Sequence, residues 1–133
     1  DTCFTLRQGT DVTLVTWGAM VKETLAAADA LEAEGISAEV IDVATLKPLD
    51  AETILASVEK TGRLIIVHEA AQTGGFGGEI AAQVAEHGLL HLQAPIGRVC
   101  GYDVVPPLPK LEDAFLPSEA RILEAALGAV NFA

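Results

Sequence analysis

The sequence predicts an α/β fold, a three-layer sandwich in which helices cover both faces of a mostly parallel mixed sheet. Two observations lead to this class. Short runs rich in Val, Ile and Leu alternate along the chain with longer segments in which apolar residues recur every three or four positions. The short runs are typical of strands buried on both faces, and the longer segments are typical of amphipathic helices. With 133 residues and 50% hydrophobic composition, residues 1–133 are expected to form one domain.

The first part of the chain predicts strand, helix and strand in that order. Val12–Trp17 reads VTLVTW and Ala38–Val43 reads AEVIDV, and both stretches are rich in β-branched residues. Between them, apolar side chains recur at helical spacing over Met20–Glu34, and Gly35 follows where a helix C-cap favours glycine.

A second helix and a third strand are expected next. Asp50 is suited to cap a helix over Ala51–Lys60, because its carboxylate can accept from the free amides of the first turn. Gly62 stands just beyond the expected end of this helix, and Arg63–His68 (RLIIVH) has the composition of a buried strand.

Glycine and proline separate the remaining elements. We expect a helix over Glu79–Glu86, a short strand over Ile96–Cys100 and a last amphipathic helix that begins near Pro117 and Ser118. Proline cannot occupy a helix interior, so an extended connection is expected where three prolines gather before the last helix, at Pro106, Pro107 and Pro109.

The charge balance bears on the possible partners. The sequence holds 8 Lys and Arg against 19 Asp and Glu, a formal net charge of -11. Coulomb repulsion argues against a nucleic-acid or membrane partner, and the acidity suits either a basic protein or solubility alone. No apolar run approaches the about 20 residues that cross a bilayer, and the features of a signal peptide are missing. Because the chain begins at Asp1, we expect a piece of a longer protein.

The cysteines and histidines do not predict a metal site. Cys3 and Cys100 form neither a CxxC pair nor a zinc pattern, which favours a reducing compartment without a structural disulfide. His87 and His91 are four residues apart, but Gly88 lies between them and no third ligand is well spaced. We interpret these histidines as surface or cap residues.

Four glycines, Gly74, Gly75, Gly77 and Gly78, precede a predicted helix and invite a nucleotide-binding interpretation. They do not complete GxGxxG, there is no GxxxxGK[ST] sequence, and Glu79 would place negative charge where a phosphate would bind. The alternative is that the glycines permit positive φ and close backbone approach, either within the domain or against a second chain.

Two further side chains could carry chemistry. His68 and Glu69 end a predicted strand, but strand neighbours point to opposite faces, so a hydrogen-bonded histidine at a packed edge or interface is favoured over catalysis. Arg98 lies in an apolar strand and needs a carboxylate or carbonyl acceptors, for which Asp103 is a nearby candidate. We expect an ion pair that fixes this turn, with direct ligand contact as the alternative.

Several ordered stretches resemble one known family. They are DVTLVTWG at Asp11–Gly18, EVIDVATLKPLD at Glu39–Asp50, VHEAAQTGGFGGEIAAQVAE at Val67–Glu86, and the later LQAPIGRVCGYDVVPPLP. In these stretches the chain resembles the C-terminal domain of the β subunit of thiamine diphosphate-dependent 2-oxoacid dehydrogenases, the E1 component, which has the transketolase C-terminal domain-like fold. TGGFG and RVCGYD are most similar to the branched-chain (2-oxoisovalerate) type. A pyruvate or acetoin type and a free-standing small-ligand-binding domain are the alternatives.

The resemblance implies a domain for assembly and docking in an oxidoreductase. In the intact α2β2 enzyme, thiamine diphosphate and Mg would lie between the α subunit and the upstream domain of the β subunit. No catalytic, cofactor-binding or metal-binding residue is therefore expected in this chain, which should be inactive alone. The implied partners are the E1 α subunit, a second β subunit and the basic subunit-binding domain of the E2 lipoyl acyltransferase. The location would be cytoplasmic in a bacterium and the mitochondrial matrix in a eukaryote.

The resemblance also implies which residues form the subunit interface or the E2-docking surface. These are His68, Gly75, Phe76, Gly77, Gln93, Pro95, Arg98 and Phe132. There is one departure from the family pattern, because an acidic residue usually precedes the Ala-Pro pair and this chain has Gln93 there. Glutamine accepts a hydrogen bond without supplying charge, so docking is expected to be weaker or to be carried by other acids.

Overall fold

The sheet has five strands and defines the architecture. The computed structural model describes residues 2–103 and 116–132, so the expected connection with Pro106, Pro107 and Pro109 lies outside the described residues. The strand order is β1-β3-β2-β4-β5, and all neighbours are parallel except β1 and β3. The strands are β1 Cys3–Arg7, β2 Val12–Thr16, β3 Ala38–Val43, β4 Leu64–Ala71 and β5 Gly97–Gly101.

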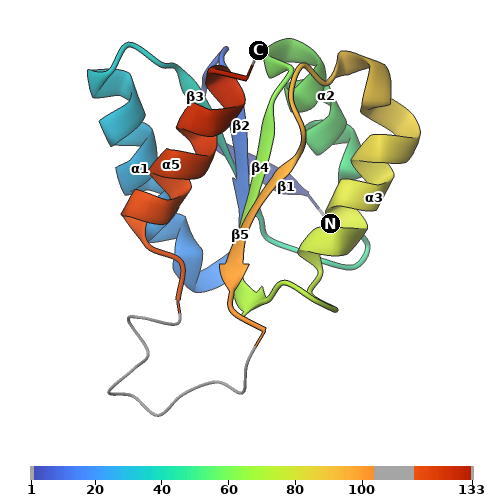
Figure 1. Cartoon of the computed structure of the whole chain (residues 1–133). Coiled ribbons are helices and arrows are strands. Elements are labelled where there is room, and N and C mark those ends of the chain that lie inside the picture. The colour runs from blue at the N-terminus through green and yellow to red at the C-terminus, as the bar shows by residue number, and fades with distance from the viewer. Residues whose placement is uncertain (1, 104–115, 133) are drawn as a thin grey trace.

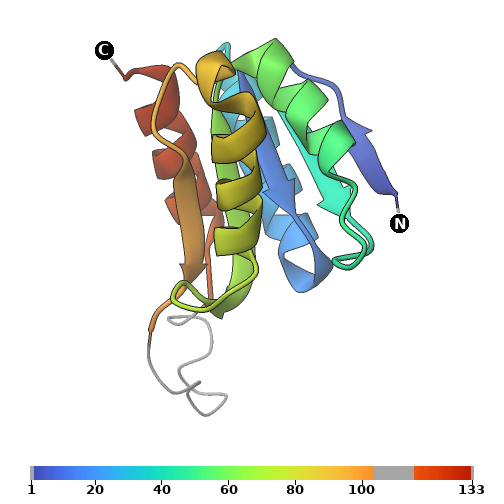
Figure 2. The same cartoon turned by 90° about the vertical axis from the view of Figure 1, so that its right-hand side faces the viewer.

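Helices form a layer on each face of this sheet, as Figures 1 and 2 show. Helices α1 and α5 pack together on one face, and α2 and α3 pack together on the other. This arrangement confirms the predicted three-layer α/β fold with a mostly parallel mixed sheet. The helical elements are η1 Gly18–Met20, α1 Val21–Ala33, α2 Ala51–Thr61, α3 Gly77–Gly88, η2 Leu89–His91 and α5 Glu119–Val130.

The core is divided into two layers by the sheet. Successive strand side chains point to opposite faces, so Leu14 packs on the α1 and α5 side whereas Val15 packs on the α2 and α3 side. Leu31 and Ile122 belong to the first layer, and Ile54 belongs to the second. All five side chains are at most 1% exposed. The predicted buried strands and amphipathic helices therefore bury the faces that their spacing indicated.

Local capping fixes the helix boundaries. Asp50 accepts a hydrogen bond from the Thr53 amide at 3.2 Å, as predicted for an N-cap, and Gly62 ends α2 in the left-handed region with φ of 73°. Ser118 caps α5 in the same way through the Arg121 amide, at 3.2 Å. The largest boundary differences from expectation are at α3, which begins two residues early at Gly77 and ends two residues late at Gly88, and at β4, which continues past His68 to Ala71.

Strand β1 was not predicted. Buried and exposed residues do not alternate regularly along β1. Cys3 is buried, whereas Phe4 and Leu6 are 54% and 43% exposed. It pairs antiparallel with β3 at the edge of the sheet, where only one neighbour covers it. An edge strand of this kind lacks the continuous apolar run that made the other strands visible in the sequence.

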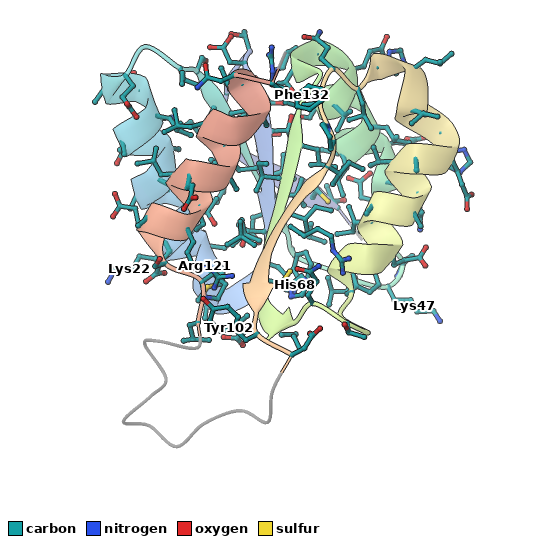
Figure 3. All side chains as sticks on the ribbon, in the orientation of Figure 1. Lys22, Lys47, His68, Tyr102, Arg121 and Phe132 are labelled. Atoms are coloured by element: carbon teal, nitrogen blue, oxygen red, sulfur yellow. The ribbon has the colours of Figure 1, made fainter. Side chains whose placement is uncertain are left out.

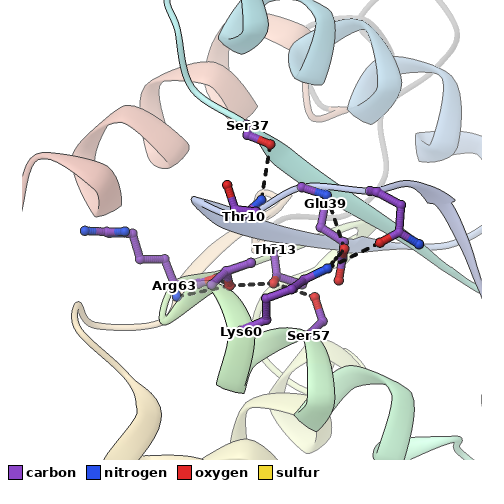
Figure 4. Close-up of polar contacts among 10 residues, drawn as sticks. Thr10, Thr13, Ser37, Glu39, Ser57, Lys60 and Arg63 are labelled. Atoms are coloured by element: carbon purple, nitrogen blue, oxygen red, sulfur yellow. Dashed lines mark hydrogen bonds and ion pairs between the residues drawn. The ribbon is translucent and has the colours of Figure 1, made fainter.

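A buried polar network joins the elements at the amino ends of the parallel strands (Figure 4). The Thr13 hydroxyl lies 2.7 Å from both the Ser57 and the Thr61 hydroxyls. Glu39, 4% exposed, accepts from the Lys60 ammonium and from the Gly9 amide. Burial alone would raise the pKa of Glu39, but these hydrogen bonds outweigh it and lower the pKa. The network thereby ties β2, β3 and α2 together without leaving a carboxylate unpaired.

Candidate functional site

His68 is the centre of a packed cluster at the carboxyl ends of the strands (Figure 3). Its side chain is 1% exposed, and its Nε2 atom lies 3.3 Å from the Cys100 sulfur. The Trp17 ring stacks on the imidazole with 5.3 Å between ring centroids, and Phe76 meets Trp17 edge-on at 6.1 Å. In open α/β sheets, ligands commonly bind where the strand order reverses, which here is the crevice between β2 and β4. Trp17 directly follows β2 and His68 belongs to β4, so their stacked rings lie at this crevice.

The segment of residues 72–78, which we call the glycine turn, packs closely against the His68 imidazole. A Cβ atom on Gly75 would lie 2.4 Å from the Ala71 carbonyl oxygen and 2.7 Å from His68 Cε1. A Cβ atom on Gly77 would lie 2.6 Å from His68 Nε2, and Gly74 has a positive φ of 77°. These contacts favour close packing within the domain as the role of the glycines.

The electrostatics of the cluster favour neutral groups. Burial lowers the pKa of His68, the backbone of Ala70 acts against this effect, and the charge of Arg98 adds to it. Burial also raises the pKa of the Cys100 thiol, although Arg98 and Arg121 act in the opposite direction. A neutral imidazole beside a protonated thiol is a packed pair with little nucleophilic character. Glu69 is exposed, so it does not share the environment of His68.

The expected ion pair between Arg98 and Asp103 is not formed: no contact within 4.0 Å joins their charged groups in the described part of the chain. Instead, each of the two side chains forms hydrogen bonds with a residue of the glycine turn. Arg98 donates to the Gln72 carbonyl at 2.7 Å, while Asp103 accepts from the Thr73 amide at 2.9 Å and from its hydroxyl. These hydrogen bonds lower the pKa of Asp103, and the nearby Arg98 charge adds to the effect. The prediction that these residues fix a turn is correct, but the ion pair is wrong because backbone groups compete for both side chains.

The described residues offer poor sites for a metal ion or a phosphate group. Within residues 2–103 and 116–132, no three His, Cys, Asp or Glu side chains converge on a metal position. His87 and His91 are both exposed, as surface histidines would be. Glu79 lies in the first turn of α3, where its charge opposes a phosphate. None of the described helices is both long enough and apolar enough to cross a membrane.

A second candidate site lies at the amino ends of the strands, where Phe132 is labelled in Figure 3. It is a hollow of about 480 Å³, which we call the amino-end groove. Its lining is apolar except for Gln93 and consists of Ala85, Leu89, Leu92, Gln93, Ala94, Pro95, Ile96 and Phe132. Leu89 and Phe132 are 61% and 55% exposed, and the adjoining Leu90 is 96% exposed. Exposed apolar side chains that gather at a concave surface are a mark of a binding site.

Gln93 is held in place by the turn that ends α2. Its amide donates to the Gly62 carbonyl at 2.7 Å, and its side chain lies so close to Gly62 that a Cβ there would be 2.7 Å from Nε2. The exposed Gln93 side chain is therefore positioned by backbone contacts rather than by a charged partner.

The structure thus separates the eight predicted interface residues into two groups. His68, Gly75, Phe76, Gly77 and Arg98 lie at the carboxyl end, whereas Gln93, Pro95 and Phe132 line the amino-end groove. Sequence reasoning missed Trp17 and Cys100 as neighbours of His68, and Leu89 and Leu90 beside Phe132. Two consecutive leucines directly after the end of a helix were the available signal for the groove.

Comparison with known proteins agrees with this architecture. Residues 2–122 match the family model described as Transketolase, C-terminal domain. The chain therefore belongs to the transketolase C-terminal domain family, as the sequence stretches indicated.

Among its relatives, the chain is similar to the pyruvate dehydrogenase E1 component subunit beta of Bacillus subtilis (strain 168) and of Staphylococcus epidermidis (strain ATCC 12228). The identities are 47% and 45% over 126 residues, which cover 95% of this chain and 39% of each relative. The chain thus spans about two fifths of the length of these proteins.

Solved structures show the same fold. The chain is similar to a split gene transketolase described as an inactive beta4 tetramer, with a TM-score of 0.85 and 32% identity over 97% of this chain and 41% of that one. A transketolase mutant from Pichia stipitis aligns with a TM-score of 0.67 over 98% of this chain and 18% of that one. At 17% identity, this second likeness shows the fold alone.

Proposed function

We propose that this chain is the subunit-assembly and E2-docking domain of the β subunit of a 2-oxoacid dehydrogenase E1 component. The similarity to pyruvate dehydrogenase E1 β subunits over 95% of the chain supports the protein class. The exposed apolar groove lined by Gln93, Pro95 and Phe132 supports the docking role, because these three residues belong to the set predicted for the subunit interface or for E2 docking, and they lie together. In the intact enzyme the domain would support oxidative decarboxylation of a 2-oxoacid and transfer of the acyl group to lipoyl-E2.

The cofactor role belongs to other parts of that enzyme. The described residues suit thiamine diphosphate poorly, because Trp17 and His68 stack on each other beside β2 and β4, and Glu79 rather than a cation stands in the first turn of α3. Their acidic side chains also form no three-ligand group for Mg²⁺. We therefore assign thiamine diphosphate and Mg²⁺ to other parts of the intact enzyme, and the E1 α subunit remains a proposed partner.

Docking at the amino-end groove would depend mainly on apolar contact. Among the described residues that line it, Gln93 alone has a polar side chain, and this side chain carries no charge. The net charge of -11 would still attract a basic E2 subunit-binding domain over long range, chiefly raising the association rate and the selectivity. A second β subunit is the other proposed partner, and the partly exposed Phe76 and Arg98 are the carboxyl-end residues that could take part in that contact.

Two observations bear on the 2-oxoacid. TGGFG at Thr73–Gly77 and RVCGYD at Arg98–Asp103 resemble the branched-chain type, whereas the relatives with 45% and 47% identity are named pyruvate dehydrogenase. We assign the branched-chain type as the first candidate and the pyruvate type as the second. Turnover of 2-oxoisovalerate and of pyruvate by the intact enzyme decides between them.

Calorimetric titration of the chain with the E2 subunit-binding domain tests docking. Salt-sensitive association at one E2 domain per pair of chains is expected, with binding weakened by Phe132→Ala and unchanged by Lys47→Gln. Lys47 is exposed and is remote from Phe132 in Figure 3, so Lys47→Gln controls for a surface substitution outside the groove. Absence of binding at low salt would contradict the docking role.

The expected inactivity of the chain alone has its own test. The chain with thiamine diphosphate and Mg²⁺ should decarboxylate neither 2-oxoisovalerate nor pyruvate above a control without protein. Product above that control would show that the chain contains a working active site and would overturn the assignment of the chemistry to other parts.

A further inference from the structure

One ion pair of the molecule joins a buried acid to an exposed base. Among the ion pairs between described residues, only that of Lys60 of α2 with Glu39 of β3 has a buried member (Figure 4). The Glu39 side chain is 5% exposed, whereas the Lys60 side chain is 41% exposed. A buried carboxylate that loses its counter-charge strongly destabilises the structure around it. The base on which the buried acid depends can therefore be reached from solvent.

The same pair fastens the segment that follows strand β1. Lys60 Nζ donates to Gln8 Oε1 at 3.3 Å, and the Gly9 amide donates to Glu39 Oε1 at 3.2 Å. Gly9 is buried, and a Cβ atom on it would lie 2.2 Å from the backbone carbonyl carbon of Ala38. Both members of the ion pair thus hold the connection between β1 and β2 against β3.

Strand β1 lies at an edge of the sheet and pairs only with β3. Its Phe4 and Leu6 side chains are 54% and 43% exposed. Arg7 binds Asp29 and Glu32 of α1, but both acids are at least 72% exposed, and exposed ion pairs contribute little to stability. Because an edge strand with few buried side chains opens locally more readily than the core, loss of the buried ion pair should release β1 first.

We propose that Lys60 is an acylation site and that its acylation releases strand β1. In the reaction, the uncharged Nζ amine attacks the carbonyl carbon of an acyl thioester. A C–N bond forms, the C–S bond breaks, the sulfur leaves as a thiolate, and the nitrogen loses a proton to solvent. The product is an uncharged amide, so Glu39 stays buried but loses its counter-charge.

The class of acyl donor follows from the proposed enzyme, which transfers its acyl group to a sulfur of lipoyl-E2 and so forms a thioester. This choice of donor rests on the proposed function. The effect of acylation on β1 rests only on the contacts of Lys60 and Glu39. The two parts are therefore tested separately.

Cys3 reports on the release of β1. It is 6% exposed and pairs with β3 opposite Val43, whereas Cys100 is 2% exposed and belongs to β5 at the other edge of the sheet. The chain has only these two cysteines, so mass spectrometry after treatment with a thiol reagent gives both reaction rates. Because a buried thiol reacts only when its surroundings open, Cys3 should react faster than Cys100.

Matched variants reproduce the loss of charge. Lys60→Gln should accelerate the reaction of Cys3 about tenfold to a hundredfold, as expected for loss of a hydrogen bond between charged groups. Lys60→Arg keeps the charge and should have a smaller effect. Lys47 is exposed and forms no ion pair with another described residue, so Lys47→Gln should leave the rate unchanged.

Glu39→Gln tests the mechanism. In this background, Lys60→Gln should change the rate at Cys3 by less than about twofold, because no buried charge is left to lose its partner. An effect as large as in the wild-type background would overturn the role of the ion pair. Equal rates at Cys3 and Cys100 in the Lys60→Gln chain would mean that the whole fold opens together, and would overturn the release of β1.

Acylation is tested on the wild-type chain with acetyl-coenzyme A, an acyl thioester. Mass spectrometry should find the acetyl group on Lys60, and Cys3 should react about tenfold faster or more in molecules acetylated there than in unmodified ones. This comparison also decides if Lys60→Gln fails to fold, as judged by Trp17 fluorescence.

The outcomes of this experiment are distinct from those of the docking titration. Acetylation of Lys22 and Lys47 without Lys60 would overturn the modification site. An unchanged rate at Cys3 in molecules acetylated at Lys60 would overturn the release of β1. Neither result bears on E2 binding at the amino-end groove, whose lining includes neither Lys60 nor Glu39.

Discussion

The two ends of the sheet use their side chains in opposite ways. At the carboxyl end, His68 is 1% exposed, stacks on Trp17, and lies under a glycine turn that Arg98 and Asp103 fasten. At the amino end, Leu90 is 96% exposed and adjoins a groove lined almost entirely by apolar residues. At the end where α/β proteins commonly bind ligands, His68 is packed by the chain's own residues, and the exposed apolar groove lies at the other end.

This difference indicates how the domain divides its tasks. The stack of Trp17 on the buried His68 ring adds packing at the carboxyl end, so this cluster is expected to stabilise the fold. Apolar surface that the fold leaves exposed contributes nothing to folding and is available to a partner. Substitutions at the carboxyl end should therefore change stability, whereas substitutions at the amino end should change association.

The largest effect on stability is expected for Gly75→Ala. The new Cβ would lie 2.4 Å from the Ala71 carbonyl oxygen, a backbone atom that cannot move independently, and 2.7 Å from the His68 ring. Overpacking of this kind should lower the free energy of unfolding by about 3 kcal/mol, measured by urea denaturation.

Gly128→Ala is the matched control for that substitution. Gly128 lies within α5, and a Cβ there would meet no atom within 4 Å. Alanine at this position should raise the free energy of unfolding by up to about 1 kcal/mol, because it is the better helix former. Equal stability of Gly75→Ala and wild type would show that the glycine turn is not packed against His68 and Ala71.

The second effect is a pH dependence that originates at His68. Burial lowers its pKa in the folded state below the ordinary value of about 6.5, so between these two values the unfolded chain binds more protons. Stability from this group is therefore complete above pH of about 6.5 and falls as the pH decreases, by at most about 1.4 kcal/mol per pH unit.

His68→Gln removes the titrating group and should flatten this part of the profile. Urea unfolding is compared between about pH 5 and pH 7, where the ordinary pKa of histidine dominates the change. His87 and His91 are exposed and remain in both proteins, so their contribution cancels in the comparison. The same slope in the variant as in wild type would place the pH dependence on another residue.

The sequence allowed the main elements of the fold to be predicted because their signals are local. Asp50 and Gly62 mark the ends of α2 through interactions within a few residues, and the buried strands form continuous apolar runs. Strand β1 escaped prediction because its pairing with β3, rather than its composition, makes it a strand. The ion pair of Arg98 was wrong for a similar reason, since the competing Gln72 carbonyl is brought near by tertiary structure.

The candidate site was predicted only in part. The resemblance implied eight residues for a subunit interface or an E2-docking surface, and the chain direction places the end of β4 and the connection before β5 at opposite ends of the sheet. His68 was correctly interpreted as a packed histidine, since strand neighbours point to opposite faces. That Leu90 would be almost fully exposed depends on which surfaces η2 leaves uncovered, and periodicity does not encode this.

The smallest effect on stability is expected at the amino end, where Leu90→Ala should change the free energy of unfolding by less than about 0.5 kcal/mol. The same substitution at the fully buried Leu31 should cost about 2–5 kcal/mol, because it opens a cavity in the core. Urea unfolding of both variants gives the comparison. Leu90→Ala should also weaken binding of the E2 subunit-binding domain, since Leu90 adjoins the exposed Leu89 of the groove. A Leu90 variant that unfolds as readily as the Leu31 variant would mean that this surface is covered in the folded chain, and the amino end would then have no apolar face to offer a partner.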